Sequence, residues 1–214
     1  MPPFYPTRYL DLYDVPMRLI VARWNSHGML RQMTFKTAIS LIAFQVGWFA
    51  TVLGAAHERA WLGLIVVPAI LALHLFLAQD WRRELALAAA TGLLGFVVDS
   101  ALVSTAVFAP IPFVWASPPW SPPWMAMLWV NQAAVLNASL AWMRGRYLLG
   151  ALFGAIGGPL AYLSGAKLGA MLRLPSSQGL FIIGLTWAVA FPVLQALAAK
   201  AAGPVPPANP PREP

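Results

Sequence analysis

The chain has 214 residues, of which 59% are hydrophobic and 10% are charged, and its formal net charge is +7. Soluble domains are about 45–50% apolar and about 25% charged, so this composition excludes a soluble globular protein and, over most of the length, a disordered one. The absence of cysteine excludes disulfides, iron–sulfur clusters and thiolate metal sites.

The two ends of the chain differ from its centre. Residues 1–36 form a basic leader in which we expect no secretory signal, because no apolar core precedes a small-residue cleavage site. Two interpretations of this cytoplasmic leader stay open: a helix lying on the membrane surface and a loosely ordered segment. Residues 200–214 are rich in proline and predict a disordered cytoplasmic tail.

Residues 37–199 contain six stretches that are apolar and long enough to cross a bilayer, which needs roughly 20 helical residues. Their hydrophobicity is nearly continuous, without the alternation of barrel strands. The sequence therefore predicts an all-α fold, a polytopic membrane bundle of six transmembrane helices. We expect these helices over residues 37–56, 60–79, 84–108, 124–143, 147–172 and 178–199.

The positive charge gives the orientation, because short cytoplasmic loops are enriched in Lys and Arg. Of the 14 basic residues, only Arg59, Lys167 and Arg173 fall on one side of the predicted spans, and the other eleven fall on the opposite side. We therefore expect both termini in the cytoplasm and a multi-pass protein of the bacterial inner membrane. Membrane lipids, rather than nucleic acid, are the partner that this charge predicts.

The predicted external loop over residues 109–123 carries no charge and is rich in proline and tryptophan. Tryptophan prefers the membrane interface, and proline is tolerated in the first turn of a helix. Two interpretations stay open: an interfacial collar that anchors two helices, and a lid over an external cavity.

Asp99 is the only acidic residue in the interior of a predicted span, and a carboxylate there is costly unless it is paired, hydrated or protonated. Lys167 lies at a comparable depth with the opposite charge. We expect a polar ligand pocket in the outer half of the bundle, formed by these two residues with Asn131, Gln132, Gln45 and Tyr162. A structural charge pair or hydrogen-bonded core residue is an open alternative for Asp99, and a catalytic acid is another.

The fifth predicted span contains glycines at four-residue spacing, which lets helix backbones approach closely. The following Pro159 predicts a kink or a break in the helix, and broken helices often line binding sites. Tight packing alone is the alternative explanation. The residues concerned are Gly150, Gly154, Gly157, Gly158, Pro159, Gly165 and Gly169.

His74 is the only histidine inside a predicted span. A hydrogen-bonded helix contact is the simplest interpretation, and a proton relay or quinone contact is the alternative. No nucleotide-binding or hydrolase motif occurs, and no ligand set for a metal is present. We therefore expect no metal and no cofactor.

Several separated motifs resemble a family of small bacterial inner-membrane proteins that is catalogued as a domain of unknown function. The resemblance covers about residues 40–198 and implies the same membrane architecture without a named activity. Its motifs are residues 44–49 (FQVGWF), 95–100 (GFVVDS), 137–142 (NASLAW) and 154–162 (GAIGGPLAY), together with Trp129.

A second likeness is to the tryptophan-rich sensory proteins, also called translocator proteins, and it rests on residues 118–124 (PPWSPPW) and Trp129. That family has five spans, and a loop near its first two helices covers a pocket for porphyrins and sterols. The six predicted spans and the position of the loop here differ, so the likeness is an analogy only.

Three hypotheses for the function follow. The first is a non-enzymatic membrane protein that binds or moves a small hydrophobic or lipid-like ligand in the predicted polar pocket. The second is a structural or assembly subunit that binds a membrane-protein partner through the glycine faces. The third is an intramembrane lipid-modifying enzyme that uses Asp99 or His74 as acid or base.

Overall fold

The structure is a computed structural model that describes residues 35–113 and 119–203. By its internal contacts the chain divides into Met1–Ala38 and Ile39–Pro214, and the fold below is that of the second unit. Most of the leader, the tail from residue 204 and the centre of the 109–123 loop lie outside the described residues. Predictions for those segments are therefore not examined by the structure.

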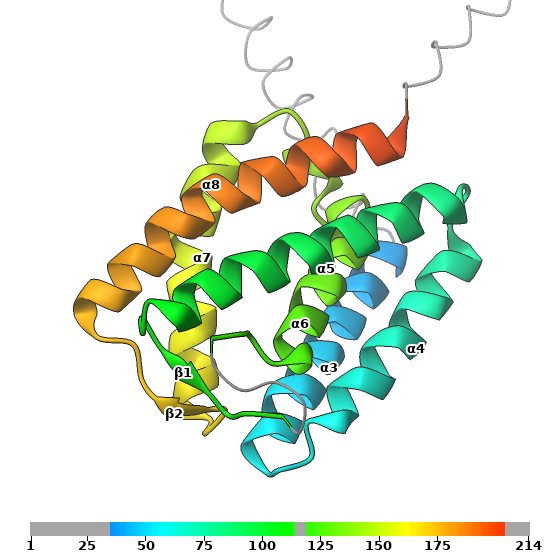
Figure 1. Ribbon diagram of the computed structural model, residues 1–214. Coiled ribbons are helices and arrows are strands. Elements are labelled where there is room, and N and C mark those ends of the chain that lie inside the picture. Colours follow the sequence, from blue (N-terminus) through cyan, green and yellow to red (C-terminus); the bar gives the residue numbers. More distant parts are fainter. Residues whose placement is uncertain (1–34, 114–118, 204–214) are drawn as a thin grey trace, which may run out of the picture. The chain divides into compact units, whose positions relative to one another are not determined.

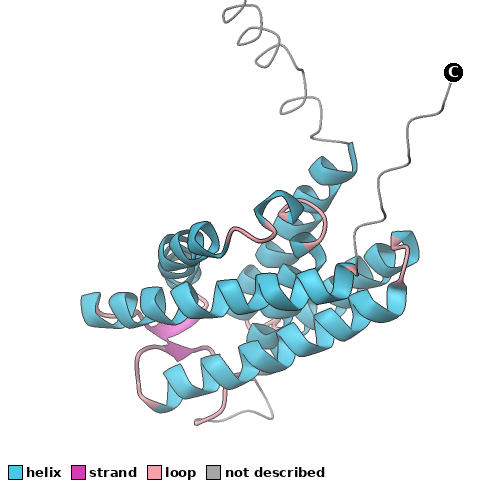
Figure 2. Ribbon diagram, turned by 90° about the horizontal axis from the view of Figure 1, so that it is seen from above, coloured by secondary structure: helices cyan, strands magenta, loops and turns pink. Residues whose placement is uncertain are grey.

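The described residues are almost entirely helical, as expected (Figures 1 and 2). A short 3-10 helix, η1 (Ala141–Met143), follows the α-helix that ends at Leu136. Two short strands, β1 (Ala109–Pro110) and β2 (Met171–Arg173), pair in an antiparallel manner. The α-helices are α3 (Phe35–Ala56), α4 (Trp61–Leu77), α5 (Trp81–Ser104), α6 (Pro123–Leu136), α7 (Tyr147–Lys167) and α8 (Ser177–Ala202).

Four of these helices, α3, α5, α7 and α8, are long and apolar enough to cross a membrane. This supports the expected class of a membrane protein. Helix α4 is also apolar but has 17 residues, and α6 has 14, so both are shorter than the roughly 20 residues that a bilayer core requires.

Three helices end earlier than the hydropathy predicts. Helix α5 ends at Ser104, where Ala106 adopts a left-handed conformation with φ 59°, and the chain turns toward β1. Helix α6 ends at Leu136 with Asn137 as its C-cap, before η1. Helix α7 ends at Lys167, just before Gly169 takes a left-handed conformation with φ 95°, and the chain then enters β2, which pairs with β1. Hydropathy continues past all three points because the connections are themselves apolar.

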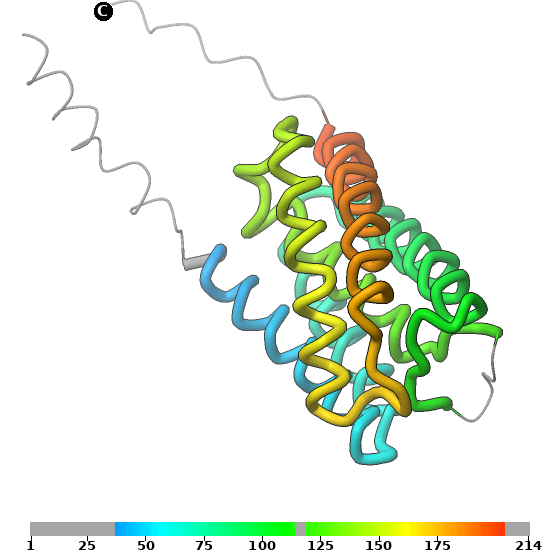
Figure 3. Tube along the Cα trace, turned by 90° about the vertical axis from the view of Figure 1, so that its left-hand side faces the viewer, coloured from blue at the N-terminus to red at the C-terminus, as the bar shows by residue number. Residues whose placement is uncertain are grey.

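The predicted break at Pro159 is not observed, since α7 runs from Tyr147 to Lys167 with this proline inside it. A proline removes one backbone hydrogen bond, which neighbouring packing can compensate. Helix α8 lies along α7 (Figure 3), and Gly184 of α8 leaves room for the Pro159 ring. The close partner helix holds this segment in place.

Successive helices of the unit run in alternating directions, so their connections gather at two opposite ends (Figures 1 and 3). At the strand end, the β1–β2 pair joins the connection after α5 to the connection after α7. At the opposite end, Asn137 beyond α6 donates a hydrogen bond to Glu84 in the first turn of α5. Helix α6 lies inside the bundle, where it contacts α4, α5 and α8.

Candidate functional site

Asp99 lies on α5, five residues before the strand end of that helix, or about 8 Å along its axis. The side chain is buried, with 1% exposure. The hydroxyl of Tyr162 on α7 donates a hydrogen bond to Oδ1, and Nε1 of Trp129 on α6 donates one to Oδ2 at 3.0 Å. One carboxyl group therefore ties three helices together.

Aromatic rings enclose this carboxyl group. The indole of Trp129 stacks on that of Trp187 from α8, with ring centroids 4.4 Å apart. The ring of Phe108 meets Tyr162 edge-on, with centroids 5.1 Å apart. We call Asp99, Trp129, Tyr162 and Trp187 the Asp99 cluster.

Two glycines make room for the rings of the Asp99 cluster. A Cβ at Gly95, one turn before Asp99, would overlap the Trp129 indole. A Cβ at Gly158, one turn before Tyr162, would overlap the Trp187 indole. On the inner faces of both α5 and α7, a glycine therefore lies one turn before the residue that makes the hydrogen bond. The space left by each glycine positions an indole ring.

The Asp99 cluster does not include the cation that the sequence suggested. Lys167 is exposed at the end of α7, and no ion pair joins it to Asp99 among the described residues. Both carboxyl oxygens of Asp99 already accept a hydrogen bond from a neutral donor. This arrangement fits a residue that links helices through hydrogen bonds better than a residue that contacts a ligand.

The other predicted pocket residues lie elsewhere. Asn131 of α6 is buried, and its Nδ2 donates a hydrogen bond to the Phe44 carbonyl of α3 at 2.8 Å. The same carboxamide lies against Gly47, so it docks α6 on α3. Gln45 is exposed on α3 and Gln132 is half-buried on α6. Of the six predicted residues, the structure thus joins Asp99 with Tyr162. Among the described residues, no hydrogen bond or ion pair links these two to Gln45, Asn131, Gln132 or Lys167.

The glycines of α7 pack against two helices. A Cβ at Gly150, Gly154 or Gly158 would overlap atoms of Gln195, Trp187 or Phe191, which all belong to α8. Gly165, in the last turn of α7, and Gly169, just after the helix, instead face Val52 and Ala56 of α3. A Cβ at Gly157 would meet only the edge of the Phe153 ring, at 3.9 Å. The spacing of these glycines accordingly matches the positions of the two neighbouring helices, α8 and α3.

A second polar group lies at the end opposite the strands, and it contains the hydrogen-bonded helix contact expected for His74. Nε2 of His74 on α4 lies 3.2 Å from Oε2 of Glu84, and Nδ2 of Asn137 donates to Oε1 of Glu84 at 3.1 Å. A guanidinium N–H of Arg144 donates to Oδ1 of Asn137 at 2.9 Å. We call these four residues the Glu84 network. Glu84, Asn137 and Arg144 were not predicted, because hydropathy gives no reason to select residues at or near helix ends. The charged and amide side chains at these adjacent helix ends were a usable signal.

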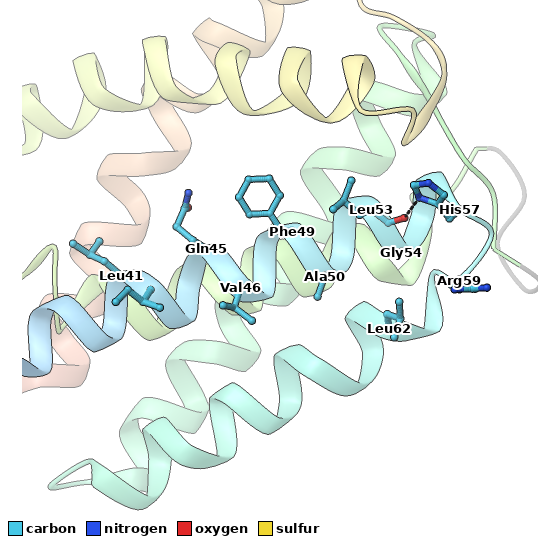
Figure 4. A pocket seen from close by; sticks show the side chains of 11 residues that line it. Leu41, Gln45, Val46, Phe49, Ala50, Leu53, Gly54, His57, Arg59 and Leu62 are labelled. Carbon is cyan, nitrogen blue, oxygen red and sulfur yellow. Dashed lines mark hydrogen bonds between the residues drawn. The ribbon is translucent and has the colours of Figure 1, made fainter.

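An apolar groove runs along α3 and reaches the start of α4, with a volume of about 770 Å³ (Figure 4). Gln45 is a polar side chain within the groove, and His57 and Arg59 lie at its strand end. Figure 4 shows Gln45, Phe49 and His57 on the same side of α3. The groove is lined by Leu41, Ile42, Gln45, Val46, Phe49, Ala50, Leu53, Gly54, His57, Arg59 and Leu62.

None of these lining residues belongs to the Asp99 cluster. The groove is instead formed by the outward face of α3, on which Ile42 is 64% exposed and Val46 is 52% exposed. Large apolar side chains at such exposure need an apolar environment.

Comparison with known proteins gives one match to a family model. Residues 37–193 match the model described as a protein of unknown function, DUF2878. No curated protein and no solved structure matches the chain.

Proposed function

Because the chain belongs to the DUF2878 family, whose description assigns no activity, we propose its function from its own geometry: it is a membrane protein that holds a small hydrophobic or lipid-like molecule in the α3 groove. The observation that carries this proposal is the groove itself, with its apolar walls and a few polar groups placed at its middle and at one end. Such a surface matches an amphipathic molecule, because few groups in it can hydrogen-bond a fully polar ligand.

We propose that all six helices cross the bacterial inner membrane. Helix α6 is short, but both of its ends are tied to α5: the Ser121 N–H donates to Ser100 Oγ at 3.0 Å, and Asn137 donates to Glu84 at 3.1 Å. Glu84 and Ser100 are separated by about 24 Å along α5. With its flanking residues, α6 therefore covers most of the bilayer core.

The described basic residues support a cytoplasmic location of both termini. Arg59, Lys167 and Arg173 lie in or beside connections at the strand end, whereas Arg82, Arg83, Arg144, Arg146 and Lys200 lie at the opposite end. The positive-inside rule then makes the strand end the external one. This orientation agrees with the larger set of basic residues in the full sequence.

The proposal moves the ligand to the surface of α3, where Gln45 is the one residue of the predicted pocket that lines the groove. Ligand contact by Asp99, Tyr162, Asn131, Gln132 and Lys167 stays a prediction that the proposed groove does not require. The buried residues among them act in the proposal as ties that hold the helices in place.

Native mass spectrometry of the protein purified in mild detergent tests the groove. Ala50 lines the groove, so Ala50→Trp should fill it and remove a retained lipid-like adduct. Leu152→Trp changes an exposed position on α7 that does not line the groove, and it should keep the adduct. Equal retention by both variants, or no adduct on the unmodified protein, would overturn the proposal.

Two alternatives have distinct readouts in the same preparation. A membrane protein that co-purifies in fixed stoichiometry would favour an assembly subunit. A changed lipid profile in cells carrying His74→Gln, with the protein present at normal levels, would favour a lipid-modifying enzyme.

A further inference from the structure

We propose that the molecule in the α3 groove is a phospholipid with a net-anionic headgroup, and that its phosphate lies between His57 and Arg59. This inference rests on the proposed function and adds the chemical class of the ligand. It is carried by the two cationic or hydrogen-bonding side chains at the strand end of the groove and by the rigid turn that presents them.

His57 is held with one ring nitrogen occupied. Its Nδ1 lies 2.9 Å from the Leu53 carbonyl oxygen, one helical turn earlier, so Nδ1 is the protonated donor in this contact. Figure 4 shows the ring at the end of the groove with this bond drawn. The exposed imidazole is thereby fixed in orientation, and in its imidazolium form Nε2 is a second N–H donor for a phosphate oxygen.

Arg59 is presented by a tight turn between α3 and α4. The Arg59 N–H donates to the Gly54 carbonyl at 2.7 Å, and Glu58 takes a left-handed conformation with φ 59°. A non-glycine residue in this conformation carries a backbone cost that the surrounding structure must offset. Here the turn is braced by Gly54, which packs closely on the Arg59 carbonyl and on Leu62.

The charges around this turn leave the guanidinium available. Glu58 is the acidic residue in the turn, and it is exposed and does not line the groove. No ion pair joins it to Arg59 among the residues that the structure describes. Arg59 can therefore donate several N–H groups to phosphate oxygens, an arrangement that guanidinium geometry favours.

The dimensions of the groove fit one leaflet of a bilayer. From Leu41 to His57 the groove follows α3 for about 24 Å. Half of a bilayer core is about 15 Å, so an acyl chain that begins at His57 would end near Gly47. The exposed Gln45 then lies beyond the end of that chain, near the bilayer centre.

Lipid competition in micelles tests the headgroup. We would add equal amounts of phosphatidylglycerol and phosphatidylethanolamine to the detergent-solubilised protein and measure the ratio of bound lipids by native mass spectrometry. The unmodified protein should be enriched in phosphatidylglycerol by roughly fivefold for each cationic contact. The variant His57→Gln/Arg59→Gln should bind the same total lipid at the ratio present in the micelle.

Lys167→Gln is the matched control, because Lys167 is an exposed cation at the same end of the bundle that does not line the groove. It should keep the enrichment. If the double variant keeps the enrichment, or if Lys167→Gln loses it equally, the anionic headgroup is refuted while the groove proposal stands. If Ala50→Trp retains all bound lipid, the groove proposal itself is refuted.

Discussion

The Asp99 cluster and the Glu84 network use the same functional group at opposite ends of α5 in different ways. Asp99 is buried and takes its hydrogen bonds from the neutral donors Tyr162 and Trp129. Glu84 keeps 14% side-chain exposure and pairs with His74, while Asn137 links it to Arg144. The first is insulated by aromatic rings and the second lies at a helix end near charged residues.

This difference indicates that the position of a carboxyl group, in the interior or at a helix end, determines which hydrogen-bond partners it has. In the interior, long-range packing of glycine and tryptophan places neutral donors on Asp99. At the helix ends, polar side chains can meet without displacing the apolar core. We therefore expect the Asp99 cluster to be sensitive to shape and to lost hydrogen bonds, and the Glu84 network to be sensitive to charge.

The largest expected effect comes from Asp99→Leu. It leaves the Tyr162 hydroxyl and the Trp129 indole N–H buried without their acceptor, and each unpaired donor costs roughly 1–3 kcal/mol. Thermal unfolding in detergent, followed by tryptophan fluorescence, should show a much lower midpoint. Asp99→Asn keeps one acceptor oxygen and should lose less. A midpoint for Asp99→Leu equal to that of the unmodified protein would contradict the role of Asp99 as a tie.

The adjacent glycines of α7 give a matched pair with a smaller effect. Gly158→Ala places a methyl group in the Trp187 indole and should cost roughly 1–3 kcal/mol of unfolding free energy. Gly157→Ala meets only ordinary van der Waals contact and should be neutral or stabilise by up to about 1 kcal/mol, because alanine favours the helix. Similar midpoints for the two variants would show that the α7–α8 packing is looser than described.

Glu84→Gln should have a moderate effect, about 0.5–1.5 kcal/mol, because the amide keeps the shape and an acceptor but removes the charge. A double-mutant cycle with His74→Gln measures the coupling directly. The coupling should fall in high salt, since the pair is partly exposed, whereas the cost of Asp99→Leu should not. A coupling energy of zero at low salt would remove the Glu84 network as a tie between α4 and α5.

Lys167→Gln should have the smallest effect, within about 0.5 kcal/mol, as is usual for exposed positions. Its unfolding midpoint is a test of the charge pair with Asp99 that the sequence suggested. A loss as large as that of Asp99→Leu would mean that the two residues do pair in the membrane.

The all-helical membrane architecture could be predicted because continuous hydropathy over many residues reports burial in lipid or protein. The start of α7 at Tyr147 and the end of α3 at Ala56 agree with the sequence ranges. The ends of α5, α6 and α7 could not be placed, because apolar residues also occupy the connections. Short strands such as β1 and β2 depend on a partner about 60 residues away and leave little local pattern.

The partners of Asp99 were harder to identify. Hydropathy gives the depth of a residue but not the direction in which its side chain points, so Lys167 was favoured over Tyr162 on α7 by its depth and opposite charge. A usable indication was the run of small residues at helical spacing on α5, including Ala88, Gly92 and Gly95, which marks the same face as Asp99. Small residues on that face leave room for large aromatic rings, and therefore favour donors such as Trp129 and Tyr162 over a lysine.

The short helix α6 has a consequence for the lipids around the protein. A lipid-facing helix of 14 residues would force the bilayer to thin locally, at a cost for every ångström of mismatch. Helix α6 avoids this cost because α4, α5 and α8 surround it and Trp124, Trp129 and Leu136 are buried. Helix α6 therefore does not set the fit of the protein to membranes of different thickness. That fit depends on the outward-facing helices, including the 17-residue α4, on which Phe76 is 85% exposed.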